Sequence, residues 1–202
     1  MNIRRLIKIV CKDFPELTCF GNYLVFKRFE FILSGIAIEK TGSGICFYKF
    51  MYPTFDIQQE VNLLYSERLG AEKYYLDITN LTAGIIEFEL RRRIKMALNQ
   101  IDKVVSLEDF IDVLNSREGL REHSHARMVC GLSLLLLNRE DESELVFEEV
   151  KGTFHPSIAK DCLDFIDIAK RSPDEARKVL FTKDTAFKIK YKLTIEKVDT
   201  QP

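Results

Sequence analysis

The chain has 202 residues, of which 46% are hydrophobic and 30% are charged. This length suits one large domain or two small ones, and the apolar content is enough for a sizeable core. Because 30 basic residues nearly cancel 31 acidic ones, no overall charge draws the molecule to nucleic acid or to an anionic membrane.

The cysteines are odd in number, widely spaced and free of any CxxC pair. This spacing excludes a zinc ribbon or a thioredoxin-like motif, and a secreted disulfide framework normally has an even set. Lys8 and Lys12 interrupt the apolar run at the N-terminus, and no secretory cleavage site follows it. No apolar stretch approaches the about 18 residues of a membrane span. We expect reduced cysteines and a cytoplasmic protein without a membrane partner.

The N-terminal part of the chain, 1–80, has the periodicity of one helix followed by strands. Residues 2–13 are amphipathic, with Asn2 as a candidate N-cap. Two glycines in Thr41–Gly44 favour a tight hairpin connection. No helical pattern separates the strands, so we expect an antiparallel meander of four to six. The expected strands are two short ones within 17–26, joined by a turn at 20–23, then Phe29–Lys40, Ile45–Tyr52, Val61–Tyr65 and Lys73–Ile78.

From residue 81 the apolar residues recur with helical spacing. Ser106 precedes early carboxylates, and Ser172 precedes proline, both of which are helix-start signals. The expected helices are Ile85–Val104, one from Ser106, His125–Leu137, Glu142–Val150, one from His155 to Lys170, and one opening at Ser172.

The C-terminal segment Phe187–Ile195 alternates apolar residues with polar ones. Strict period two favours a strand over the alternative of a terminal helix. Its outer face would carry lysines, which protect an exposed edge strand from pairing. The fold class is therefore α+β: an N-terminal helix with an antiparallel sheet (1–80), a region of five to six helices (81–182) and a C-terminal strand (183–202). No low-complexity linker separates them, so one compact unit is an open alternative.

The histidine pair His123 and His125 is the strongest candidate for site chemistry. Two metal ligands on a helix need i, i+4 spacing, whereas i, i+2 points the rings apart. The glycines of Lys40–Gly44 follow the lysine, in the wrong order for a phosphate-binding loop. Cys130 lies in a run that we expect to be buried. We assign no catalytic, cofactor-binding or metal-ligating residue, and we expect no enzymatic activity.

Charge is distributed unevenly along the chain. Residues 140–149 hold six acidic residues and no basic one, and the segment 177–197 is basic. Solvated helix faces are one interpretation of this pattern, and docking surfaces for oppositely charged partners are the other. The candidate partner-binding residues are Glu140, Asp141, Glu142, Glu144, Lys188, Lys190 and Lys192.

Three segments carry a resemblance to a known family. They are the strand 33–39, the aromatic strand 47–53 that ends in proline, and 65–70, which ends in Arg-Leu-Gly. Over positions 1–80 this pattern resembles uncharacterised bacterial proteins similar to the immunity proteins that accompany polymorphic toxins. The sequence lacks the tryptophan that such aromatic strands often carry. The resemblance implies a binding protein that acts without catalysis.

Two functions follow from these observations. The first is a protein-binding module that docks on another protein and neutralises or regulates it. The alternative is a nucleic-acid-binding or nucleic-acid-processing factor, with His123, His125 and neighbouring carboxylates as its site. The absence of a catalytic motif and the polarised charge favour the first.

Overall fold

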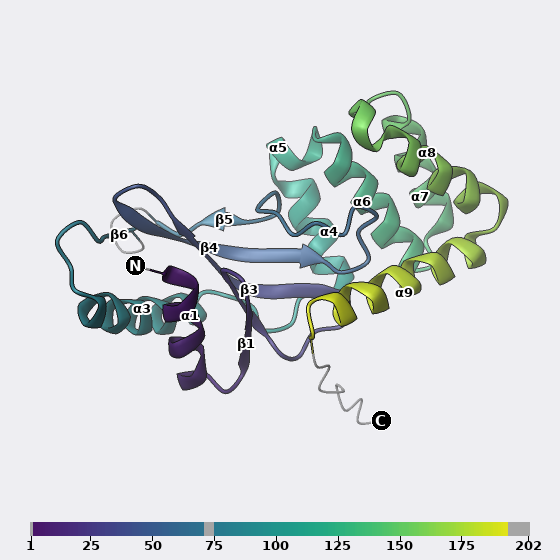
Figure 1. The fold of residues 1–202 in the computed structure, drawn as a ribbon. Coiled ribbons are helices and arrows are strands. Elements are labelled where there is room, and N and C mark those ends of the chain that lie inside the picture. The colour runs from purple at the N-terminus through teal and green to yellow at the C-terminus, as the bar shows by residue number, and fades with distance from the viewer. Residues whose placement is uncertain (1, 71–74, 194–202) are drawn as a thin grey trace. The chain divides into compact units, whose positions relative to one another are not determined.

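The computed structural model describes residues 2–70 and 75–193, and its chain forms two compact units (Figure 1). The first, here called the sheet unit, comprises residues 1–52, 65–105 and 193–202. The second, the helical unit, comprises residues 53–64 and 106–192. The segment 53–64 thus leaves the sheet unit between two strands and packs with helices that come much later in the sequence.

The sheet unit contains an antiparallel sheet in the strand order β1-β2-β3-β4-β5, with β6 paired to β4. The α+β class and the meander are confirmed. Its elements are α1 (Ile3–Val10), the 3-10 helix η1 (Cys11–Asp13), β1 (Leu17–Phe20), β2 (Tyr23–Phe26), β3 (Ile32–Lys40), β4 (Gly44–Pro53), β5 (Glu67–Arg68), β6 (Tyr75–Asp77) and α3 (Ala83–Leu98).

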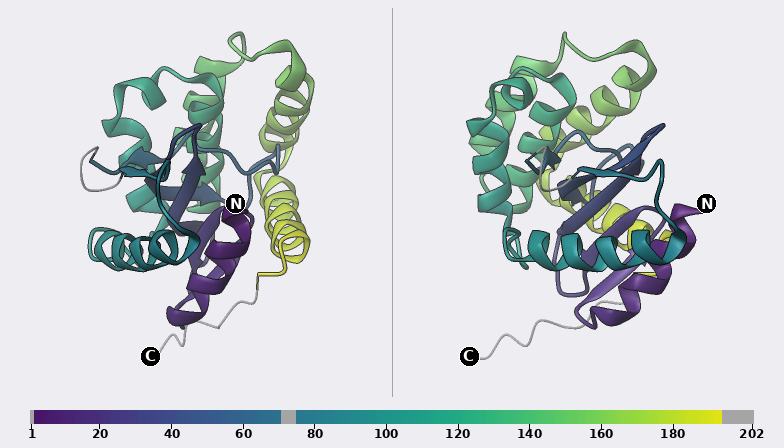
Figure 2. Two further views of the ribbon diagram at one scale, coloured as in Figure 1. Left: turned by 60° about the vertical axis from the view of Figure 1, so that its left-hand side comes forward. Right: turned by 90° about the vertical axis from the view of Figure 1, so that its left-hand side faces the viewer.

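The helices α1 and α3 bury their apolar stripes against one face of this sheet (Figure 2). Ile7 and Val10 of α1 and Leu90 of α3 belong to the same core as Leu24 and Phe47 of the strands. The helix α3, which the sequence pattern assigned to the helical region 81–182, therefore lies in the sheet unit. Asn2 caps α1, as expected, by accepting a hydrogen bond from the Arg5 amide.

Gly35 is required by the pairing of β2 with β3. Its φ is 156°, and a Cβ at this position would lie 2.0 Å from the carbonyl oxygen of Leu24. Only glycine combines this backbone conformation with so close an approach of the neighbouring strand. The register, in which Val25 faces Gly35, therefore depends on this one residue.

The helical unit is built around α6, whose residues 125, 126 and 128–135 are all buried. Its elements are α4 (Leu107–Ser116), α5 (Glu118–Arg121), α6 (Ser124–Leu136), α7 (Glu140–Val150), α8 (Pro156–Arg171) and α9 (Pro173–Lys190). Ser106 forms a capping box with Asp109 at the start of α4, and His155 and Ser172 cap α8 and α9. These starts agree with the sequence predictions. None of the helices in residues 2–70 and 75–193 is both long and apolar enough to cross a membrane.

Two sequence predictions in the middle of the chain are wrong. Residues 61–64 of the expected strand Val61–Tyr65 form no strand. They belong to the segment 53–64, whose apolar residues pack within the helical unit. The expected helix Ile85–Val104 ends at Leu98, with Asn99 as its C-cap. Ile101 continues the apolar spacing and is buried, but it lies in a loop. The apolar spacing therefore predicted a helix that is too long.

The expected C-terminal strand is also wrong, because α9 continues through Lys190. Its buried residues Ala176, Leu180, Asp184 and Phe187 recur every three or four positions, as helix packing requires. Ile189, which a strand would have placed on the apolar face, is 73% exposed. The alternation arose because lysines fall on both sides of the helix. Residues 191–193 follow the helix as a turn without strand structure, and residues 194–195 lie outside the described residues.

Candidate functional site

The acidic segment forms the outer face of α7, which is held tightly against α6. The Ser143 hydroxyl donates a 2.8 Å hydrogen bond to the Gly131 carbonyl. The absence of a side chain at Gly131 leaves room for the Phe147 ring, since a Cβ there would lie 2.4 Å from it. Val146, Phe147 and Val150 are buried beside α6. The acidic side chains of α7 are therefore displayed on a rigid support.

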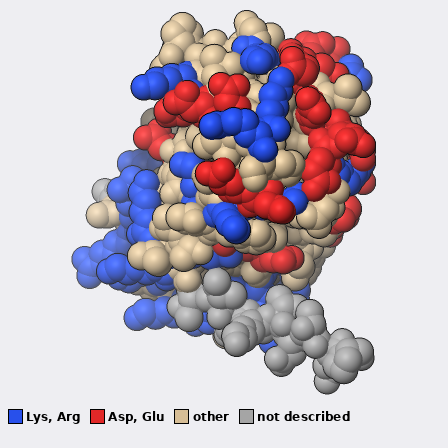
Figure 3. Space-filling view, turned by 90° about the vertical axis from the view of Figure 1, so that its right-hand side faces the viewer, with Lys and Arg blue, Asp and Glu red and all other residues tan. Residues whose placement is uncertain are grey.

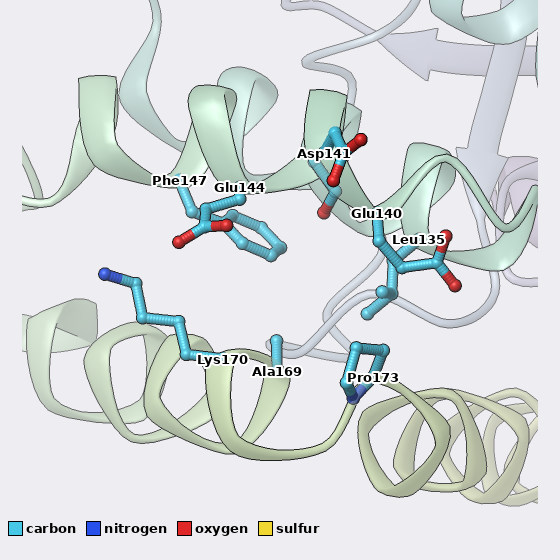
Figure 4. A pocket seen from close by; sticks show the side chains of 9 residues that line it. Leu135, Glu140, Asp141, Glu144, Phe147, Ala169, Lys170 and Pro173 are labelled. Atoms are coloured by element: carbon cyan, nitrogen blue, oxygen red, sulfur yellow. The ribbon is translucent and has the colours of Figure 1, made fainter.

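A small pocket of about 80 Å³ lies beside α7, between this helix and the junction of α8 with α9 (Figure 4). Its apolar lining comes from Leu135, Phe147, Ala169 and Pro173. Its charged lining comes from Glu140, Asp141, Glu144 and Lys170. Figure 4 shows Glu144 and Lys170 on opposite walls. The pocket thus combines an apolar lining with three carboxylates from the first turns of α7, which is a setting for a cationic group on an aliphatic stem.

Most acidic residues of α7 already have cationic partners. Hydrogen bonds from Arg177, Arg139 and Lys170 lower the pKa values of Glu140, Glu142 and Glu148 respectively. On the face seen in Figure 3, basic side chains lie among the acidic ones. The ion pairs are Glu140–Arg177 (2.6 Å), Glu142–Arg139, Glu148–Lys170 and Glu149–Arg127 (2.7 Å).

Asp141 and Glu144 differ from the other acidic residues of α7. Within residues 2–70 and 75–193, neither carboxylate makes an ion pair within 4 Å, and both are exposed at the pocket. Glu144 acts on Lys170 at longer range, because its charge contributes to raising the pKa of that lysine. Exposed ion pairs within the chain contribute little stability, because water and salt screen them. The two unpaired carboxylates are therefore the α7 charges that remain for a ligand. Of the four predicted residues on this helix, the structure singles out these two.

The predicted lysines do not form one surface. Lys188 donates a 2.7 Å hydrogen bond to the buried Asp184, one turn away on α9. Lys190 donates to the Gln59 carbonyl and lies 5.3 Å from the centre of the Tyr191 ring. Lys192 follows α9 with a φ of 54°. Lys188 and Lys190 have different partners, Lys192 lies beyond the helix, and the first two hold their own unit together.

The two histidines have separate structural positions. The His123 ring caps α6 by accepting a hydrogen bond from the Ala126 amide (3.4 Å), and burial is the main cause that lowers its pKa. His125 is only 5% exposed, and its Nε2 lies 2.9 Å from the Asp56 carboxylate, which is 1% exposed. The two rings therefore have different partners, one in the backbone of α6 and the other in Asp56. No sequence signal pointed to Asp56, because it is far from His125 along the chain and the two residues meet only in the fold.

The pair of Asp56 and His125 belongs to a polar network that anchors segment 53–64. The Thr54 hydroxyl donates to Asp184, and the Gln59 side chain donates to the Lys183 carbonyl. Near Asp56, burial raises the pKa of the Cys162 thiol to about 11, which disfavours a nucleophilic thiolate. In the part of the chain that the structure describes, no group of three or more His, Cys, Asp or Glu residues could hold a metal ion. The network is suited to holding the segment in place.

Comparisons with known proteins give no match to this chain. No protein-family model matches the sequence, and neither the curated proteins nor the solved structures give a match. The resemblance of the segment 1–80 to immunity-like proteins therefore stays a prediction.

Proposed function

We propose that the protein is a non-enzymatic binding module that docks on a basic segment of another protein and so neutralises or regulates it. The observation that carries this proposal is the α7 pocket, with its apolar lining and its two unpaired carboxylates, Asp141 and Glu144. A lysine or arginine side chain matches both features, because its aliphatic stem packs on apolar surface while its charge meets carboxylates.

The surroundings of the pocket support a protein partner. Leu145 of α7 is 67% exposed, and it adds apolar area on the same helix. Glu140 and Glu142 add negative charge, although each is shared with an arginine. Rim charges of this kind chiefly speed the encounter with an oppositely charged partner, whereas buried contacts slow its release. A basic segment would therefore associate in a salt-dependent manner.

The non-catalytic part of the proposal is supported by the roles of the histidines. His123 caps a helix, and His125 is buried against Asp56. Neither ring lines the α7 pocket. The resemblance to immunity-like proteins points in the same direction, since it implies a binder that acts by occupying its target. Neutralisation by docking needs no chemistry beyond the pocket's shape and charge.

The test is capture of a partner from the native host, followed by binding measurements with that partner purified. The double substitution Asp141→Lys with Glu144→Lys should weaken binding by at least about tenfold, mainly through slower association. Asp164→Lys with Asp167→Lys, on the exposed side of α8, is the matched control and should leave binding within twofold. Circular dichroism verifies that both variants fold. Equal binding by both double variants would contradict the proposal.

A further inference from the structure

Three adjoining hollows lie in the sheet unit around the connection from η1 to β1. Their volumes are about 380, 470 and 410 Å³. The first and second share Lys27, the second and third share Lys103, and the first and third share Phe14. The three hollows therefore adjoin one another, and the surface that they make up together is here called the lysine groove.

The lysine groove carries cations that the protein itself does not neutralise. Five lysines line it, and none of them makes an ion pair with a carboxylate in residues 2–70 and 75–193: Lys8, Lys12, Lys27, Lys95 and Lys103. Arg28 also lines the second hollow. Two arginines outside the lining are paired, because Arg91 binds Asp13 at 2.6 Å and Arg92 binds Glu89 at 2.8 Å. Of the two acidic residues in the lining, Asp13 is thus already paired, and Glu16 is the other. The groove has a local excess of positive charge.

The chemistry of the groove fits a phosphate backbone with bases attached. Ammonium groups bind phosphate as point charges without a fixed bidentate geometry. Phe14 lines two of the hollows and is half-buried, since it packs against the core of the sheet unit, and the exposed part of its ring is an aromatic surface at which a base would stack. Hollows of this size admit individual bases of a single strand. In a duplex, the bases are stacked and paired inside the double helix and do not enter such hollows. These features favour a single strand over a duplex or an acidic peptide.

We propose that the lysine groove binds single-stranded nucleic acid through its backbone, with little sequence preference. The site is independent of the α7 pocket, because the groove and the pocket belong to different units. Substitutions in either unit can therefore separate this binding from the function proposed above. If nucleic-acid binding by the groove is refuted, the proposed function of the α7 pocket is unaffected, and the converse also holds.

The first test is fluorescence anisotropy of a labelled oligothymidylate of twelve nucleotides with the full chain. If all five lysines contact phosphates, the affinity should fall roughly 100-fold between about 50 and 200 mM salt, since each contact contributes about −0.7 to the logarithmic slope for single strands. A duplex of the same length and a poly-glutamate peptide should compete at least tenfold less well. Salt-independent binding, no binding, or equal competition by poly-glutamate would overturn the proposal.

Single substitutions then locate the site. Lys27→Gln and Lys103→Gln should each weaken binding about fivefold at about 0.1 M salt and reduce the slope by about 0.7, because each removes one phosphate contact. Lys40→Gln is the matched control, since Lys40 is exposed on β3 of the same unit and lies outside the three hollows. Equal effects at all three positions would show that the protein attracts anions without a groove, and would refute the assignment.

A thiol supplies a second, independent readout. Cys19 lines the first hollow and is half-buried, whereas the other four cysteines are buried. Burial also raises the pKa of the neighbouring Cys11 thiol to about 12, which keeps it unreactive. Alkylation by iodoacetamide should therefore modify Cys19 first, and saturating oligothymidylate should slow that modification at least threefold. An unchanged rate at saturation would place the nucleic acid elsewhere and would overturn the proposal.

Discussion

The two units of this chain have opposite charge. The sheet unit holds 16 basic and 12 acidic residues, a formal charge of +4, whereas the helical unit holds 14 and 19, a charge of −5. In the helical unit, arginine and lysine side chains pair with four of the six carboxylates of α7. In the sheet unit, five lysines around three hollows have no such partner among the described residues. A net charge near zero therefore conceals two units of opposite charge.

The units also differ in what holds them together. The sheet unit depends on a close backbone approach at Gly35, whereas the helical unit contains the buried pair of Asp56 and His125. Each feature lies within one unit, so a substitution there tests that unit's contribution separately. Hydrogen exchange of backbone amides can assign a loss of stability to the unit that carries the change.

The largest effect is expected for His125→Ala. This substitution leaves the buried Asp56 carboxylate with only the Gln58 amide as a donor among the described residues, and breaking a buried pair in this way costs about 3–5 kcal/mol. Urea unfolding should show the loss, and exchange should increase mainly in residues 53–64 and 106–192. His123→Ala, which removes only a helix cap, should cost about 1 kcal/mol. Equal losses for the two variants would contradict the structural role given to the pair.

Gly35→Ala should destabilise the sheet unit instead. The added Cβ would meet the Leu24 carbonyl, and β2 would have to move away from β3. We expect a loss of about 2–3 kcal/mol from strain and lost packing, with exchange increased in β2 and β3. Gly42→Ala, with no atom within 4 Å of the added Cβ, is the control and should change stability by less than about 0.5 kcal/mol. Increased exchange in the helical unit alone would be the contrary result.

Gly131→Ala should have an intermediate effect in the helical unit. The new Cβ would lie 2.4 Å from the buried Phe147 ring, so that α7 must shift away from α6. Overpacking of this kind costs about 1–3 kcal/mol. Because α7 carries Asp141 and Glu144, the variant should also weaken capture of the basic partner. Gly152→Ala, which meets no atom within 4 Å, is the control for urea unfolding and for binding. Identical behaviour of the two variants would show that α7 is not held as described.

Acidification should have the smallest effect. The pKa values of Glu140, Glu142 and Glu148 are lowered by hydrogen bonds from their cationic partners. Groups with a lowered folded-state pKa stabilise the protein above their unfolded pKa, and that stability is lost as the pH falls through the folded value. Because these side chains are on the surface, the loss below about pH 4.5 should be small and should shrink further in about 1 M salt. Thermal unfolding at pH 3 and pH 7 with Glu148→Gln checks this: the variant should lose less stability than the wild type on acidification. A larger loss in the variant would contradict the sign.

Local signals in the sequence predicted much of the fold. Ser106, His155 and Ser172 marked helix starts, and the glycines between 41 and 44 marked the hairpin, because caps and turns depend on neighbouring residues. The acidic face of α7 was predicted because its carboxylates lie close together in the sequence, within residues 140–149. The pairing of Asp56 with His125 could not be predicted, since the two residues meet only through the packing of distant segments. The end of α9 was predicted as a strand because its lysines alternate with apolar residues, as polar and apolar residues do in a strand.

The lysine groove was missed for a related reason. Its lysines come from α1, η1, the end of β2, α3 and the loop that follows α3, and no window of sequence contains them all. The sequence has a basic run at 91–95, but Arg91 and Arg92 are paired with acidic residues. Of that run, only Lys95 lines the groove.

The most direct test of the central claim is a map of backbone amide shifts as a defined basic peptide is added to the full chain. A short peptide with alternating lysine and alanine serves as the probe. The α7 pocket predicts shift changes concentrated in residues 135–147 and 169–173, which disappear in the Asp141→Lys, Glu144→Lys double variant. Shift changes spread over both units, or retained in that variant, would contradict the claim that this pocket is the docking site.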